Sequence, residues 1–283
     1  MRRVVSLLAF FMCAMPAASA QPLEGRLKQI SESKVVRLAY RADANPFSFV
    51  GTQGQPDGYT IDLCKFVVRS LERQLNLTLM IEWVPVDTQS RFSAIINGLA
   101  DMECGASTVS LGRMATVDFS SFTFVENTGL IVRANSRIFS VRDIEGKKIA
   151  VIGGTTNETA LAKELQRRQL NATLIRVKDR KEGMTAFETG AVDSFASDKL
   201  LLIGAVNADA SMYRMLSENL STEPYAITLP QGDWAFRLAV NKGLSSLYSS
   251  SQILDIYVKW FSAIGERPDL LRAAVYIFGT LPE

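Results

Sequence analysis

The chain contains 283 residues, of which 47% are hydrophobic and 21% are charged. This length and composition predict a globular protein with two domains or one large one, rather than a disordered or fibrous chain. Histidine is absent, which excludes serine–histidine hydrolases, imidazole zinc sites and most metal-dependent mechanisms, because each needs a group that titrates near neutral pH or donates a nitrogen ligand.

Residues 1–20 have the pattern of a cleaved secretory signal peptide. Arg2 and Arg3 precede an apolar stretch over residues 4–12, and Ala18-Ser19-Ala20 is a small-residue cleavage pattern. The alternative is an N-terminal membrane anchor, but the apolar stretch is shorter than the roughly 20 residues that a membrane span needs. We therefore expect a periplasmic protein that begins at residue 21 and has no later membrane span.

The mature chain is expected to carry no net charge. Cleavage removes two of the 31 basic residues, and the remainder match the 29 acidic residues in number. A neutral chain with no basic tract and no interleaving of aromatic and basic residues is not suited to binding nucleic acid.

Two cysteines remain in the mature chain, Cys64 and Cys104. An oxidising compartment permits a disulfide between them if their geometry allows it. Two buried thiols are an equal alternative, because free cysteine packs as a small hydrophobe. The sequence leaves this choice open.

Strand and helix patterns alternate in the first part of the chain. Such alternation predicts parallel strands joined by crossover helices, with loops gathered at the carboxyl ends of the strands. The expected strands span residues 35–40, 79–84 and 101–105, and the expected helices span residues 61–75 and 90–98.

A second alternating series begins after Ser136, so we expect two α/β lobes rather than one continuous sheet. Its expected strands span residues 147–152, 172–177 and 192–197, with helices between them. The remaining patterns predict strands over residues 225–229 and 234–240, then helices over residues 244–263 and 269–278.

Polar and charged residues follow several of these strands. They are Arg41, the segment Thr88 to Arg91, the loop from Cys104 to Arg113 with Thr108, the turn Gly153 to Asn157, and Asp198. An arginine fork suits a carboxylate, a glycine turn before a helix suits an anion, and an aspartate suits an ammonium. Each feature alone is also typical of a solvated loop or a helix N-cap. Together they predict a cleft that holds a small charged molecule from both sides.

The motif Gly58-Tyr59-Thr60-Ile61-Asp62-Leu63 resembles the signature of the polar amino acid-binding proteins of ABC importers, the family-3 extracellular solute-binding proteins. The third position of that signature is usually acidic and is Thr60 here. The resemblance extends from about Val35 to Phe261 through Glu103-Cys104-Gly105, Arg113, Asp118-Phe119-Ser120, Gly154-Thr155-Thr156 and Asp198. Within the family, the chain looks most like the glutamate/aspartate-binding proteins.

The resemblance implies an α/β fold of the type II periplasmic binding protein class, with two lobes, two hinge crossings and a ligand cleft between the lobes. Lobe 1 is expected to comprise residues 21–132 and 227–283, and lobe 2 residues 133–226. The crossings are expected near residues 131–134 and 226–229.

The resemblance also implies a role for each site residue. Arg113, Thr108 and Thr155 are expected to hold the α-carboxylate of an amino acid, Asp198 its α-ammonium, and Arg41, Thr88 and Arg91 its side-chain carboxylate. Arg180 stands where the glutamate/aspartate binders carry a histidine, and Ala106 replaces a serine, so only backbone is offered there. Three arginines at the distal end exceed what one carboxylate needs. The sequence leaves open a larger or more acidic ligand, or one arginine that faces solvent.

The implied function is capture of glutamate or aspartate in the periplasm by cleft closure and delivery to a membrane ABC permease, by a monomer without metal or cofactor. The alternative is an enzyme on the same scaffold, similar to cyclohexadienyl dehydratases that act on prephenate or arogenate, for which Asp43 and Glu158 are the nearby acids. A receptor sensor domain is disfavoured, because the chain stops at Glu283 without a membrane span or signalling module.

Overall fold

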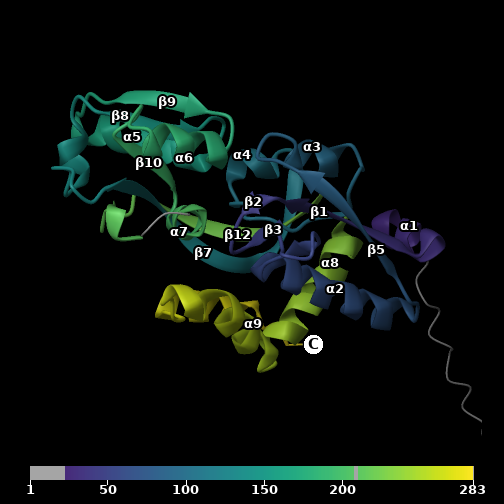
Figure 1. The fold of residues 1–283 in the computed structure, drawn as a ribbon. Helices are drawn as coiled ribbons and strands as arrows, with labels where there is room; N and C mark the ends of the chain where they lie inside the picture. The colour runs from purple at the N-terminus through teal and green to yellow at the C-terminus, as the bar shows by residue number, and fades with distance from the viewer. Residues whose placement is uncertain (1–22, 207–209, 283) are drawn as a thin grey trace, which may run out of the picture.

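The structure is a computed structural model that describes residues 23–206 and 210–282; the expected signal peptide lies outside these residues. The chain forms two α/β lobes, with the lobe of β8, β9 and β10 at the upper left of Figure 1 and the lobe of β1, β5 and α2 at the right. Among the described residues, no helix is long and apolar enough to cross a membrane.

Lobe 1 is built on the parallel strands β5 (Met80–Val86), β1 (Val35–Arg41) and β6 (Met102–Glu103). A small second sheet follows β1 and consists of β2 (Asp43–Ala44), β3 (Ser48–Val50) and β4 (Pro56–Asp57). The helices of this lobe are α1 (Gly25–Ser33), α2 (Tyr59–Leu75), α3 (Arg91–Ile96), α4 (Leu111–Met114), α8 (Trp234–Tyr248), α9 (Gln252–Phe261) and α10 (Leu270–Gly279).

Lobe 2 is built on the parallel strands β10 (Ser194–Asp198), β8 (Lys148–Ile152) and β9 (Thr173–Val177). Its helices are α5 (Thr156–Arg168), α6 (Arg180–Glu188) and α7 (Lys199–Ala205), and the short strand β11 (Tyr213–Met215) lies at its edge.

Two long antiparallel strands connect the lobes: β7 (Val117–Arg133) and β12 (Ser221–Pro230). They pair from Ser221 opposite Thr128 to Pro230 opposite Val117, and β7 continues into lobe 2, where it pairs with β10. The hydrogen-bonded order is β5-β1-β6-β12-β7-β10-β8-β9. We expected two lobes and no continuous sheet. The two lobes are present, but the second expectation was wrong: the sheet is continuous because β7 and β12 contribute to both halves.

Each lobe has its own core, and Leu200 and Leu201 of α7 pack from lobe 2 into the core of lobe 1. In lobe 1, aromatic rings gather where the connecting strands enter, and the ring of Phe124 lies 5.0 Å from those of Phe47 and Phe261. In lobe 2, alternate residues of β7 enter opposite sides of the sheet: Leu130 and Val132 belong to one buried cluster and Ile131 to another. This alternation is the period of a strand buried on both faces.

The expected strand over residues 234–240 is wrong. Trp234, Phe236, Leu238 and Val240 alternate as in a strand, but the segment begins α8, whose N-cap Asp233 accepts a hydrogen bond from the Phe236 N–H at 3.0 Å. The buried residues of α8 recur at helical spacing and include Phe236, Ala239, Val240, Gly243, Leu244 and Leu247. Capping and a helical apolar face therefore prevail over a short alternating pattern.

In the structure, Cys64 of α2 and Cys104 directly after β6 form a disulfide with their Cα atoms 6.3 Å apart. Both residues are fully buried in lobe 1. The bond attaches α2 to the start of the polar loop that carries Thr108 and Arg113, so it restrains that loop within the lobe.

Replacing both cysteines with alanine should lower the free energy of unfolding by up to about 4 kcal/mol, because the disulfide restricts the unfolded chain over a separation of 40 residues. Urea unfolding of the mature protein would measure the loss. Intact mass after alkylation of the denatured protein is the direct check: both thiols should resist alkylation until a reductant is added. Modification of both thiols without reductant would contradict the disulfide.

Candidate functional site

A small cavity lies between the lobes. Each residue that the sequence nominated as a ligand contact lines it: Arg41, Thr88, Arg91, Ala106, Thr108, Arg113, Thr155, Arg180 and Asp198. The wall also includes Ile152, Thr156, Asn157 and Leu201, which were not nominated. The structure thus brings the nominated residues together, while their contacts with a ligand remain a prediction.

The topology explains this convergence. Arg41 is the last residue of β1, Asp198 is the last residue of β10, and Thr155 lies between β8 and α5. The other wall residues of lobe 1 follow β5 and β6 in the same way. Because the carboxyl ends of parallel strands meet at one edge of a sheet, two lobes that face each other at this edge enclose a site between them.

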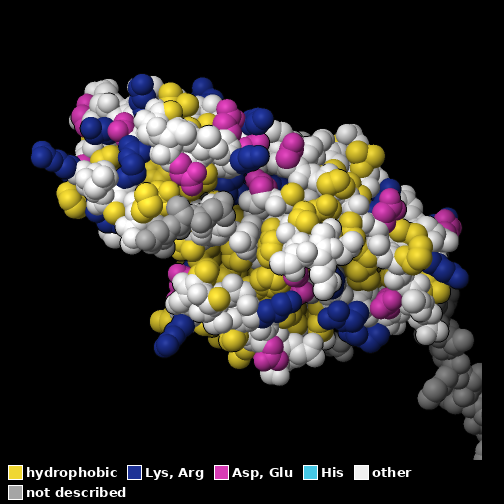
Figure 2. All heavy atoms as spheres, in the orientation of Figure 1, with side chains coloured by type: hydrophobic (Ala, Val, Ile, Leu, Met, Phe, Trp, Pro, Cys, Tyr) yellow, Lys and Arg dark blue, Asp and Glu magenta, His cyan; other side chains and the backbone are white. Residues whose placement is uncertain are grey.

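The two lobes are in contact around the cavity. The Gln89 side-chain amide donates to the Gly153 carbonyl at 3.0 Å, and the hydroxyl of Thr156 lies 3.3 Å from that of Thr108. Gly204 of α7 packs against the backbone of Asn45, with no room for a Cβ atom between them. Figure 2 shows basic and acidic side chains where the two lobes meet. The structure is therefore a closed arrangement.

Arg91 and Arg113 are the two arginines of the wall that have no ion pair within residues 23–206 and 210–282. Both guanidiniums lie over the ring of Phe92, at 4.7 and 4.9 Å from its centroid. Arg113 also donates to the Thr108 carbonyl at 2.7 Å, whereas Nε of Arg91 is buried without a hydrogen-bond partner. Burial, with the charges of Arg41 and Arg113, lowers the pKa of Arg91 to about 9, so it stays a cation at neutral pH.

Arg41 and Arg180 share a carboxylate. Arg41 donates from Nε to Asp43 at 2.8 Å, and its Nη2 lies 2.6 Å from the same oxygen. Arg180 reaches across from lobe 2 and donates from Nη1 to the Asp43 carbonyl at 2.7 Å, with Oδ2 of Asp43 at 3.4 Å. Both arginines are at most 5% exposed, and Arg91 is 4% exposed. None of these three arginines faces solvent, which excludes the alternative of a solvent-facing arginine.

Asp198 is the unpaired anion of the wall. It is 5% exposed, makes no ion pair with a cationic side chain of the described chain, and is the N-cap of α7 without a side-chain capping bond. Its carboxylate is therefore free of the capping role that was its alternative explanation. Burial and then the nearby Glu223 raise the pKa of Asp198, so a cation placed beside it would be stabilised.

A hydrogen-bond chain connects Asp198 to the strands that join the lobes. Nδ2 of Asn157 donates at 2.7 Å both to Asp198 and to the Thr128 hydroxyl on β7. Thr128 in turn donates to Glu223 of β12 at 3.1 Å. The sequence did not predict this series of hydrogen bonds. Asn157 belongs to the glycine turn that was singled out, but nothing local in the sequence marks Thr128 or Glu223.

Buried carboxyl groups lie behind the cavity wall. Glu103 of β6 accepts from the Thr228 hydroxyl at 3.0 Å and adds negative potential near Arg91 and Arg113 without forming an ion pair with either. Glu126 lies opposite Glu223 across β7 and β12. Burial raises the pKa of Glu126 to about 8, so it is mostly protonated at neutral pH and two adjacent buried anions are avoided.

Thr155 has a capping role as well as a place in the cavity wall. Its hydroxyl accepts from the Glu158 N–H at 3.2 Å and donates to the Ile152 carbonyl at 2.7 Å. The first backbone N–H groups of α5, which have no partners inside the helix, are thus presented to the cavity with the positive end of the helix dipole.

The two acids nominated for an enzymatic alternative have lowered pKa values. Burial raises the pKa of Asp43, but the charges of Arg41 and Arg180 outweigh it. Glu158 accepts from the Gly154 N–H at 2.8 Å and pairs with Arg176, and these contacts likewise outweigh its desolvation. Neither residue resembles a general acid, which requires a raised pKa to hold a proton at neutral pH.

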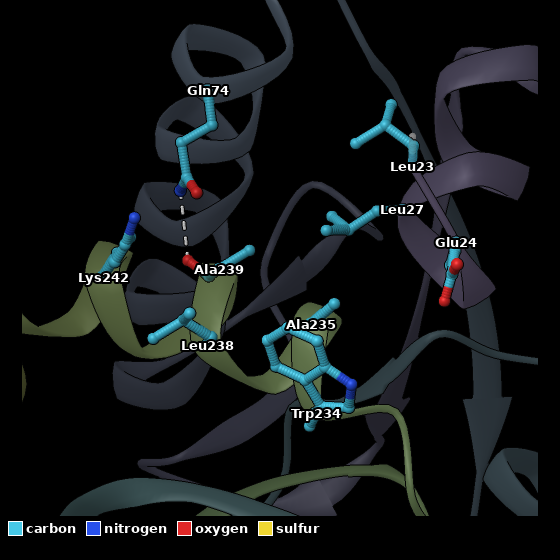
Figure 3. Close-up of a pocket in the computed structure, with 9 residues that line it drawn as sticks. All are labelled: Leu23, Glu24, Leu27, Gln74, Trp234, Ala235, Leu238, Ala239 and Lys242. Carbon is cyan, nitrogen blue, oxygen red and sulfur yellow. Dashed lines mark hydrogen bonds between the residues drawn. The ribbon is translucent and has the colours of Figure 1, made fainter. Parts of the chain in front are cut away.

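A second hollow lies between α1, α2 and α8 and shares no lining residue with the interlobe cavity (Figure 3). Its surface is mainly apolar, with Leu23, Leu27, Trp234 and Leu238 around it, and Gln74 donates to the Ala239 carbonyl at 3.1 Å. It contains none of the nominated residues and no convergent set of charges. The interlobe cavity is therefore the stronger candidate site.

A family model and a related protein both match this chain over most of its length. The model of the bacterial extracellular solute-binding proteins, family 3, matches residues 36–263. An L-glutamate/L-aspartate-binding protein of Pseudomonas aeruginosa is 33% identical over 247 residues, which cover 86% of this chain and 82% of that protein.

Two solved structures have the same architecture. A cysteine-binding protein from Campylobacter jejuni has a TM-score of 0.75 at 23% identity, with 88% of this chain and 97% of that chain covered, and supports the fold alone. An ancestral amino acid-binding protein, a precursor of cyclohexadienyl dehydratase, has a TM-score of 0.72 at 25% identity, with 84% of this chain and all of that chain covered.

Proposed function

Because the chain belongs to the bacterial extracellular solute-binding proteins of family 3, we propose that it captures L-glutamate or L-aspartate in the periplasm and delivers it to a membrane ABC permease. In this proposal it is exported by a cleaved signal peptide and acts as a monomeric, non-enzymatic carrier without a cofactor. The observation that carries the proposal is that Arg91, Arg113 and Asp198 line one cavity without an oppositely charged partner among the described side chains.

The unpaired charges of the cavity wall indicate which charges the proposed ligand carries. A buried ion is costly unless a partner of opposite charge replaces its lost hydration. Two guanidiniums and one carboxylate are best complemented by a molecule with two carboxylates and one ammonium.

The free hydrogen-bonding groups suggest the ligand's orientation. The α-carboxylate lies against Arg113, Thr108 and the first N–H groups of α5, and the α-ammonium lies against Asp198. The side-chain carboxylate lies against Arg91 and Thr88, because Nε of Arg91 and the Thr88 hydroxyl are both buried without a partner. Ala106 contributes backbone, and Arg41 and Arg180 complete the distal wall.

Closure of the lobes traps the ligand. We place the lobe boundaries at residues 21–132 with 227–283 and at residues 133–226, which puts both divisions inside β7 and β12. Bending of these two strands opens the cleft, and the ligand shifts the population toward the closed arrangement by bonding to both lobes at once. The closed form is then the one that the permease recognises.

A dehydratase on this scaffold is the competing function, and the similarity to an ancestral precursor of such enzymes is the reason to test it. A dehydratase acting on a cyclic dicarboxylate needs an acid in the cleft and no ammonium receptor. Incubation of the protein with prephenate and measurement of product absorbance should show no turnover; sustained turnover would contradict a carrier function.

Replacement of Arg91 by Gln should weaken binding of L-glutamate by at least about thirtyfold, or about 2 kcal/mol, because the side-chain carboxylate loses its cation. Binding of L-glutamine should change far less. Replacement of Arg113 by Gln should weaken both, because both amino acids have an α-carboxylate. Calorimetry on mature protein freed of bound ligand would measure these affinities.

Arg176 supplies the control, because its side chain is 72% exposed and pairs with Glu158 on the solvent side. Arg176→Gln should leave both affinities within about threefold of the original. Failure of the unaltered protein to bind any acidic amino acid, with tight binding of a neutral one, would contradict the proposed ligand.

Replacement of Gly204 by Ala should hinder closure, because its Cβ atom would lie 2.2 Å from the Asn45 carbonyl oxygen across the cleft. We expect L-glutamate affinity to fall about tenfold, or about 1.4 kcal/mol, with the unfolding temperature of the ligand-free protein unchanged. Gly112→Ala is the control, since nothing lies within 4 Å of a Cβ atom there. Equal affinities of the two variants would contradict a requirement for this interlobe contact.

A further inference from the structure

Asp43 lies between two arginines that belong to different lobes. It is on β2 of lobe 1, next to the end of β1, and its carboxylate contacts Arg41 of its own lobe and Arg180 of lobe 2. We propose that Asp43 is an internal counter-ion that occupies Arg41 and Arg180 and so determines how strongly the cavity prefers an acidic over a neutral side chain. This inference rests on the proposed function and assigns a specificity-determining role to a residue that does not line the cavity.

The geometry shows that Asp43 is the main partner of both arginines. Arg41 directs Nε and Nη2 to one carboxylate oxygen, and Arg180 contacts the backbone carbonyl and the other carboxylate oxygen. The remaining contact of Arg180 is a 3.4 Å bond to the Ser197 hydroxyl. Because a hydrogen-bonded carboxylate neutralises a guanidinium far better than a distant charge does, the charges of these two arginines are already partly compensated.

The charge state of Asp43 agrees with this role. Its pKa lies below the ordinary aspartate value, because the two guanidinium charges outweigh the effect of burial. Asp43 is therefore ionised at neutral pH. Asp43 carries one negative charge, whereas Arg41 and Arg180 together carry two positive charges. The distal end of the cavity therefore keeps the positive charge of Arg91 and only part of the positive charge of Arg41 and Arg180.

Removal of the negative charge of Asp43 should make the distal end more positive. Asn at this position keeps the size and the backbone carbonyl but leaves Arg41 and Arg180 without a carboxylate. A ligand with a side-chain carboxylate then replaces the missing charge, whereas glutamine cannot. Loss of the interlobe contact itself weakens both ligands alike, since both are bound in the closed form, and it cancels in the ratio of their affinities.

The test is the ratio of dissociation constants for L-glutamine and L-glutamate, measured by calorimetry on Asp43→Asn, Arg180→Gln, the double variant and the unaltered protein. Asp43→Asn should raise the ratio at least tenfold. Arg180→Gln should lower it by a similar factor, because Asp43 then faces fewer cations. The double variant, which removes one charge of each sign, should lie within about threefold of the original ratio.

Arg176→Gln again serves as the control and should leave the ratio unchanged, because it alters an ion pair on the solvent side. If Asp43→Asn does not fold, the comparison of the double variant with Arg180→Gln decides instead: the ratio should be higher in the double variant, and equal ratios would overturn the counter-ion role. An unchanged or lower ratio in folded Asp43→Asn, with L-glutamate bound by the unaltered protein, would overturn the counter-ion role alone. Absence of acidic amino acid binding by the unaltered protein would overturn the proposed function together with this role.

Discussion

The constraint on which the rest of the site depends is the burial of positive charge between two lobes. Four guanidiniums line one closed cavity; those of Arg41, Arg91 and Arg180 are buried and that of Arg113 is half-buried, and a buried cation is costly without a carboxylate beside it. Asp43 compensates Arg41 and Arg180 from within the protein. Arg91 and Arg113 have no such partner in the described chain; in the proposed function, a ligand with two carboxylates supplies it. In the proposed function, closure and recognition are therefore one event.

The fold places this charge where movement of the lobes can expose or bury it. β7 and β12 belong to both lobes, and they also carry Thr128 and Glu223, which are connected through Asn157 to Asp198. The proposed ammonium receptor is thus connected to the same strands that bend in the proposed opening of the cleft. The aromatic packing around Phe124 anchors these strands in lobe 1, so the proposed opening bends them between the two cores.

Sequence reasoning predicted the alternating strands and, through the family resemblance, the residues that converge on the cavity. It did so because strand ends and glycine turns are local patterns. It failed where a longer-range contact decides the outcome. The alternation in residues 234–240 concealed α8, and Asp43 was considered only as an acid because its arginine partner in lobe 2 is 137 residues away in sequence. Asn157 was part of a recognised turn, but its contacts on β7 and β10 could not be inferred from that turn.

The most direct test of the central claim is a crystal structure of the mature protein with L-glutamate. The account predicts closed lobes, with the α-carboxylate on Arg113, the ammonium on Asp198 and the side-chain carboxylate on Arg91, while Asp43 keeps its contacts with Arg41 and Arg180. A ligand whose side-chain carboxylate displaces Asp43 from both arginines and leaves Arg91 without a partner would contradict it.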